Sequence, residues 1–194
     1  MPLYTSTYLK QLSAGTLSSV KNRLFTESRN LSTGFDIFLS HCFLDKDEVE
    51  GIYIELANKG YSVYVDWIVD PHLNRNNVTR GTAEHIQNRM KTSKSLLLAI
   101  STSAQLSKWI PWELGFIDGL RNQSALFPVS REPITPKTFH RSEYLLLYPY
   151  LKLADIDNKE ELLITESSNE YSNLGDWVKR QIKPVYKTRN IDFL

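Results

Sequence analysis

Short hydrophobic runs alternate along this chain with segments in which apolar residues recur at helical spacing. The runs rich in β-branched, aromatic and aliphatic residues predict strands, at residues 35–40, 61–67, 95–101, 125–130 and 144–153. Helical spacing predicts helices between and after these strands, at residues 48–60, 82–93, 111–122 and 172–182. Such an alternation is typical of a parallel sheet with helices on both faces. We therefore expect an α/β protein with a three-layer, flavodoxin-like fold and a sheet of roughly five parallel strands.

Two terminal segments lie outside this alternation. Residues 1–33 are rich in Ser and Thr, and we expect a helical extension there that docks on the domain or on a second copy. Its apolar stripe comprises Leu17, Val20, Leu24 and Phe25. A surface helix with no part in the chemistry is the more ordinary interpretation. We place the main domain at residues 34–155 and expect residues 156–194 to supply a helix that packs on it.

The composition narrows the classes of partner and the compartment. The 23 basic and 22 acidic residues give a formal net charge of +1, so electrostatics offer no reason to expect nucleic acid. No apolar run approaches the ~18 residues of a membrane span, and the N-terminus lacks the apolar core of a secretion signal. The one cysteine, Cys42, excludes an internal disulfide, and the scattered histidines lack metal-ligand spacing. We expect a cytoplasmic protein without a metal and without membrane contact.

Polar residues stand at the carboxyl ends of the first three predicted strands. The first strand ends in Ser40 and His41, the second in Asp66 and the third in Ser101. The carboxyl ends of parallel strands meet at one edge of a sheet, where ligands bind. We therefore expect these three segments to converge on one rim. His41 and Cys42 are neighbours on a strand and face opposite ways, which counts against a thiol nucleophile with its base.

Residues 107–119, SKWIPWELGFIDG, place two tryptophans around a proline and a carboxylate directly after the second. Trp109 and Glu113 are four residues apart and would face the same way on a helix. Trp109 suits either packing or stacking on a flat ligand. On composition alone Glu113 would be a solvated surface acid. Trp112, Phe116 and Leu120 recur at the spacing i, i+4 and i+8 of a core stripe, and we assign Trp112 to packing.

Three sequence boxes, in order, resemble those of the TIR (Toll/interleukin-1 receptor/resistance) domain in its bacterial branch. The first is FDIFLSH at residues 35–41. The second is a strand that ends at Asp66 and continues through a long loop into the next helix. The third combines Ser101, Trp109 and Glu113. The resemblance covers roughly residues 35–130 and implies the flavodoxin-like fold of that family.

Many domains of this family cleave NAD between nicotinamide and ribose, and the resemblance implies the same activity here, with NAD as substrate and no cofactor. Glu113 would be the catalytic residue. The substrate rim would be formed by Trp109, Phe35, Ser40, His41, Asp66, Asp70 and Ser101. The loop at residues 68–80 would mediate assembly with other TIR domains, through Pro71, Arg75 and Arg80. The family also implies antiphage defence of the Thoeris type, with a separate effector or sensor protein as partner.

Several of these residues have an equally ordinary interpretation. Asp70 followed by Pro71 is good turn chemistry, so Asp70 need not bind ribose hydroxyls. The more ordinary interpretation of Arg75 and Arg80 is that they are solvated charges of a loop, although they could also bind phosphates or an acidic neighbouring subunit.

A single carboxylate is chemically sufficient for this reaction. Ordinary glycosidases need a second carboxyl group to protonate a poor leaving oxygen. Nicotinamide in NAD is already a cation and departs neutral, so one carboxylate that stabilises the developing positive charge on ribose is enough. Two alternatives remain at this point: a TIR scaffold without activity, and a nucleoside deoxyribosyltransferase. Hydrolysis, cyclisation and conjugation share one intermediate, so the sequence leaves the product open.

Overall fold

The computed structural model of the chain describes residues 4–31, 34–42, 44, 46–73, 79–101, 109–130, 143–156 and 158–187. Within these ranges one sheet holds nine strands in the order β3-β2-β4-β5-β6-β7-β8-β9, and β1 also pairs with β5. The strands from β3 to β6 are parallel neighbours, whereas β6 to β9 are antiparallel. The α/β class with a mostly parallel, flavodoxin-like centre is confirmed.

The centre of the sheet is formed by β2 (Phe35–Cys42), β4 (Ser93–Ser101) and β5 (Ser124–Ser130). β4 lies between the other two. Its apolar residues are almost completely buried, which explains its unbroken hydrophobic run, because both faces of a central parallel strand are covered. β3 (Val63–Tyr64) is shorter than the sequence predicts: Asp66 opens the short helix α4 (Asp66–Val69) instead of ending the strand.

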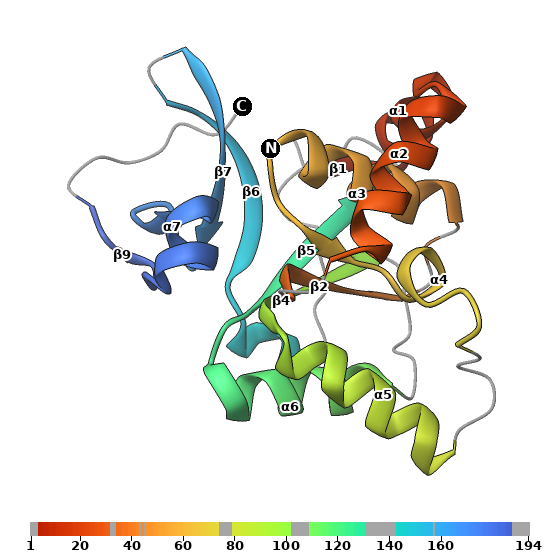
Figure 1. The fold of residues 1–194 in the computed structure, drawn as a ribbon. Coiled ribbons are helices and arrows are strands. Elements are labelled where there is room, and N and C mark those ends of the chain that lie inside the picture. Colours follow the sequence, from red (N-terminus) through yellow and green to blue (C-terminus); the bar gives the residue numbers. More distant parts are fainter. Residues whose placement is uncertain are drawn as a thin grey trace.

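Helices cover both faces of the parallel strands, so the expected three layers are present (Figure 1). On one face lie α1 (Ser6–Gly15), α2 (Ser18–Arg29) and α3 (Lys46–Asn58). On the other face lie α5 (Arg80–Lys91) and α6 (Ile110–Arg121). The first turn of α6 therefore begins next to the sheet edge where β2 and β4 end.

The N-terminal segment is built into the fold. Its first strand, β1 (Tyr4–Thr5), pairs in parallel with the end of β5. The helix expected through Leu17 is in fact two helices, and Leu17 stands between them with 70% of its side chain exposed. α1 approaches α3 so closely that a Cβ added at Gly51 would lie 2.2 Å from the carbonyl oxygen of Leu9. The absence of a side chain at Gly51 is what permits this contact.

The C-terminal part extends the sheet. The elements there are η1 (Glu143–Leu147), β6 (Tyr150–Ile156), β7 (Lys159–Thr165), β8 (Glu170–Asn173), α7 (Leu174–Arg180) and β9 (Val185–Tyr186). The strand expected at residues 144–153 thus begins as a 3₁₀ helix and becomes a strand only at Tyr150. The expected boundary at residue 155 falls inside β6, which pairs along its whole length with β7. The predicted C-terminal helix is present as α7 and packs on the sheet through Trp177, which is fully buried.

Candidate active site

Ser40 near the end of β2 and Glu113 in the first turn of α6 meet inside the domain. The Ser40 hydroxyl Oγ donates a hydrogen bond to Glu113 Oε2 at 2.5 Å, across 73 positions of sequence. Both side chains are 0% exposed. Burial of a carboxylate is costly unless polar groups satisfy it, and this hydroxyl supplies one such contact. The fold therefore holds the acid of the third sequence box directly against the serine of the first.

The face that α6 buries differs from the sequence interpretation. The buried residues follow the spacing i, i+3, i+4 and i+7, and they are Ile110, Glu113, Leu114 and Ile117. Trp112 and Phe116 are half-buried and pack against the hydrophobic core, as expected, whereas Leu120 is 49% exposed and does not continue the stripe. The residue that the hydrophobic pattern omits is Glu113, because a carboxylate does not count as apolar although this one occupies a core position on the sheet side of the helix.

Three aromatic rings, of Trp109, Trp112 and Phe116, follow one another from the N-cap of α6 along the helix and pack against the core. The rings of Trp109 and Trp112 meet edge to face with centroids 5.5 Å apart, and the rings of Trp112 and Phe116 lie 6.2 Å apart. Trp109 is the N-cap residue, and its carbonyl accepts a hydrogen bond from the Glu113 amide at 2.9 Å. The backbone of Trp109 is thereby held one helical turn before Glu113, and its half-buried indole offers a surface suited to a planar, cationic ring.

Three further residues from the sequence prediction lie at the same edge of the sheet. His41 follows Ser40 and is half-buried, and Ser101 is the last residue of β4. Asp66 follows β3, is 7% exposed, and accepts a hydrogen bond from the Trp67 amide at 2.8 Å. The convergence of strand ends that the sequence predicts is therefore present in the fold.

Phe35 does not belong to this rim. It is the first residue of β2, five positions before Ser40, and therefore lies at the opposite end of the strand. Its side chain is 1% exposed and meets the ring of Tyr64 edge to face at 5.5 Å. The placement of Phe35 on the substrate rim is corrected to the hydrophobic core.

Asp70 accepts several hydrogen bonds near the start of the loop at residues 68–80. Its Oδ2 accepts from Tyr64, from His85 Nε2 at 2.8 Å and from Arg89 Nε at 2.8 Å, and its Oδ1 accepts from Arg89 Nη2 at 2.6 Å. Desolvation opposes ionisation, but the hydrogen bonds from Arg89, His85 and Tyr64 outweigh it and lower the pKa of Asp70. Asp70 therefore anchors the loop to α5 and is not placed to hold ribose hydroxyls.

Sequence reasoning missed the partners of Asp70. One signal was available, because His85 and Arg89 are four residues apart on one predicted helix and so share a face. Nothing in the sequence indicated that this face would turn toward Asp70.

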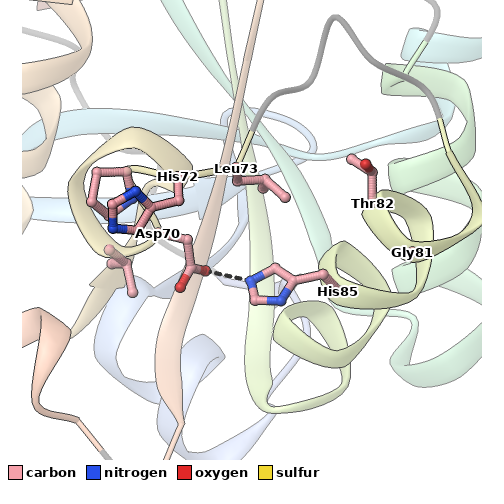
Figure 2. Close-up of a pocket in the computed structure, with 8 residues that line it drawn as sticks. Asp70, His72, Leu73, Gly81, Thr82 and His85 are labelled. Atoms are coloured by element: carbon pink, nitrogen blue, oxygen red, sulfur yellow. Dashed lines mark hydrogen bonds and ion pairs between the residues drawn. The ribbon is translucent and has the colours of Figure 1, made fainter.

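A pocket of about 530 Å³ opens beside this network. Figure 2 shows Asp70 and His85 directed toward each other, with His72, Leu73 and Thr82 around them. Of the residues expected to mediate assembly, Pro71 lines the pocket. Arg80 opens α5 with its side chain 91% exposed and contacts Glu84 at 2.8 Å, whereas Arg75 lies outside the described residues. The pocket does not include Glu113, so it belongs to the loop and not to the carboxylate site.

Two further properties concern the described part of the chain. It contains no group of three or more His, Cys, Asp or Glu side chains that could hold a metal ion. In the same ranges, none of the helices combines the length and apolar character required to cross a bilayer.

The chain is similar to one protein family and to two named proteins. The TIR domain family matches residues 37–163. The chain is 40% identical, over 148 residues, to a protein of Bacillus cereus (strain MSX-D12) named "Probable 3' cyclic ADP-D-ribose synthase ThsB'", covering 75% of this chain and 76% of that protein. It is 27% identical over 93 residues to the "Putative cyclic ADP-D-ribose synthase TIR2" of Cytobacillus dafuensis, covering 46% of this chain and 24% of that protein.

Proposed function

This chain belongs to the TIR domain family, and on that basis we propose that it cleaves NAD between nicotinamide and ribose and closes the ADP-ribosyl part into a cyclic isomer. The observation that carries the proposal is the carboxylate of Glu113, which is buried at the carboxyl ends of the parallel strands, one helical turn after Trp109. The relative that is 40% identical supports the class of product, because it is named as a cyclic ADP-D-ribose synthase.

The chemistry of bond cleavage requires little from the protein beyond charge and orientation. The bond between the anomeric carbon and the pyridinium nitrogen breaks, and its electron pair neutralises the departing nicotinamide. The ribose is left with oxocarbenium character, which the negative charge of Glu113 stabilises. Trp109 offers a ring face for the flat cationic leaving group. No proton has to be donated, so a second acid is not needed.

Exclusion of water favours cyclisation over hydrolysis. Ser40 and Glu113 are both 0% exposed, so the environment of the carboxylate is one from which bulk water is kept away. In such an environment a nucleophilic group in the ADP part of the same NAD molecule attacks the anomeric carbon. It forms the new bond that closes the ring and loses its proton. In the hydrolytic alternative, a water molecule makes the same attack and gives ADP-ribose.

The direct test is to incubate the purified chain with NAD and to follow nicotinamide and the cyclic isomer by mass spectrometry. Glu113→Gln keeps the size of the side chain and removes its charge, and we expect the rate to fall by about 10²- to 10³-fold. The matched control is Glu50→Gln, because Glu50 is also a buried glutamate but bonds with Ser13 and Lys21 on the other face of the sheet. If Glu113→Gln cleaves NAD at the wild-type rate, the role assigned to Glu113 is wrong.

We also propose that the active form is a self-assembled one and that the pocket beside Asp70 takes part in the contact. Leu73 lines this pocket and is half-buried in the isolated chain, so a partner copy could cover its remaining surface. Leu73→Glu is expected to weaken both self-association and NAD cleavage, as measured by light scattering and nicotinamide release. Leu17→Glu is the control, since Leu17 is 70% exposed and lies between α1 and α2. Assembly without nicotinamide release under any condition would favour a scaffold.

The biological role that follows is antiphage defence by a cytoplasmic enzyme that uses NAD as substrate without a further cofactor. A cyclic nucleotide has value as a signal only if a second protein reads it. We therefore propose a separate effector that binds the product. Immobilising the purified product, identifying by mass spectrometry which proteins of a cell lysate it captures, and measuring whether it activates them tests this part.

A further inference from the structure

We infer that Ser40 is a positioning residue, which fixes the orientation of the Glu113 carboxylate from inside the central sheet. The inference rests on the proposed function, because it concerns the group that performs NAD cleavage. It also changes the role expected for Ser40, which the sequence placed in contact with the substrate.

The hydrogen bond itself separates the two roles. A serine hydroxyl carries one proton to donate, and Ser40 donates it to Glu113 Oε2 at 2.5 Å. Its side chain is 0% exposed. The one hydroxyl proton of Ser40 is thus committed to the Glu113 carboxylate and is not available to a substrate, which suits a supporting contact.

The two partners differ in how firmly the fold holds them. Ser40 lies in β2, which pairs with β4 along its length, Ser40 itself opposite Leu98. Glu113 lies in the first turn of α6, and a glutamate side chain has three rotatable bonds. Because Ser40 is held in a paired strand, its hydrogen bond restricts the rotation of the more flexible Glu113 side chain. Charge stabilisation depends on a carboxylate that is already oriented before the positive charge develops.

Loss of the hydroxyl should affect turnover more than binding. Without Ser40 Oγ the carboxylate keeps its charge but loses the hydrogen bond that orients Oε2, and misplacement of about 1 Å can cost on the order of 100-fold in rate. We expect Ser40→Ala to lower kcat roughly 10- to 100-fold and to change KM less than about 3-fold. A residue that contacts NAD directly would instead raise KM.

The experiment compares four purified variants with wild type in steady-state nicotinamide release from NAD, together with their melting temperatures. Ser40→Ala removes the hydroxyl, and Ser40→Cys nearly keeps the volume but donates weakly. Ser40→Thr keeps the hydroxyl on a residue that strands favour. The matched control is Ser95→Ala: Ser95 is 0% exposed in β4 and donates to the Asp36 carbonyl at 2.8 Å.

The expected result is that the alanine and cysteine variants lose kcat at nearly constant KM, that threonine recovers most of it, and that Ser95→Ala keeps the wild-type kcat. A wild-type kcat for folded Ser40→Ala, a raised KM as the main effect, or an equal loss in Ser95→Ala would each overturn the inference. Failure of the proposed function looks different, because the wild-type chain itself would then release no nicotinamide.

Discussion

The contact between α1 and α3 makes a sharp prediction about Gly51. A Cβ at this position would lie 2.2, 2.7 and 2.9 Å from three backbone atoms of Leu9. Ordinary contacts begin near 3.4 Å, so the backbone of α1 would have to retreat by about 1 Å. Backbone cannot turn aside as a flexible side chain can. Gly51→Ala should therefore push α1 away from the domain.

The magnitude follows from three contributions. Overpacking of this kind costs about 1–3 kcal/mol. Displacement of α1 also strains the hydrogen bonds from Tyr4 and Tyr8 to Glu55, at 2.9 and 3.0 Å, and bonds to charged groups contribute about 1.5–3 kcal/mol each. Against these, alanine is favoured over glycine inside a helix by about 1 kcal/mol. We expect Gly51→Ala to lower the free energy of unfolding by about 2–4 kcal/mol.

Urea unfolding followed by tryptophan fluorescence measures this change, and hydrogen exchange in residues 6–15 reports whether α1 detaches locally. The matched control is Gly115→Ala, because Gly115 is also the sixth residue of its helix but has no atom within 4 Å of an added Cβ. That variant should gain about 0.5–1 kcal/mol. If Gly51→Ala is as stable as Gly115→Ala and keeps its protection in α1, the close approach of the two helices is refuted.

Three further variants test other parts of the structure. Burial lowers the pKa of Lys152 to about 7, so its charge opposes folding fully below that pH and less as the pH rises toward 10.5. Lys152→Met should raise the free energy of unfolding by about 1–3 kcal/mol at pH 6. Urea unfolding at pH 6 and pH 9 measures this gain, which should be smaller at pH 9. Asp70→Asn should lower the free energy of unfolding by about 1–3 kcal/mol at pH 7. Because the pKa of Asp70 is lowered from its ordinary 3.8, the difference from wild type should be complete above 3.8 and should narrow as the pH falls from there through the lowered value. Trp177→Ala should cost about 3–5 kcal/mol, whereas the half-buried Trp112→Ala should cost clearly less, by thermal unfolding; equal losses would contradict the burial of Trp177.

The sequence alone determined the centre of the fold. The strands β2, β4 and β5 and the helices α3, α5 and α6 follow from runs and spacings that depend only on residues near in sequence. The sequence also determined which strand ends meet, because parallel strands bring their carboxyl ends to one edge. For this reason the sequence by itself predicts that Ser40, Asp66 and Ser101 share one rim.

The sequence does not predict the strands that form only by pairing with residues distant in sequence. β1 is two residues long and exists only because the end of β5 is available to pair with it. The C-terminal strands extend the sheet through β6, whose antiparallel partner β7 comes from beyond the boundary placed at residue 155. Local patterns cannot report such pairings, since both partners are needed before either is a strand.

The candidate site divides in the same way. The sequence indicated Glu113 and explained chemically why one carboxylate suffices for a substrate whose leaving group is already cationic. Only the tertiary structure decided that Glu113 is a core residue, that Ser40 donates to it, that Asp70 is held by Arg89 and His85, and that Phe35 lies at the far end of its strand. The physical reason is that the orientation of a polar side chain is set by the partner that satisfies it, and each of these partners is distant in sequence.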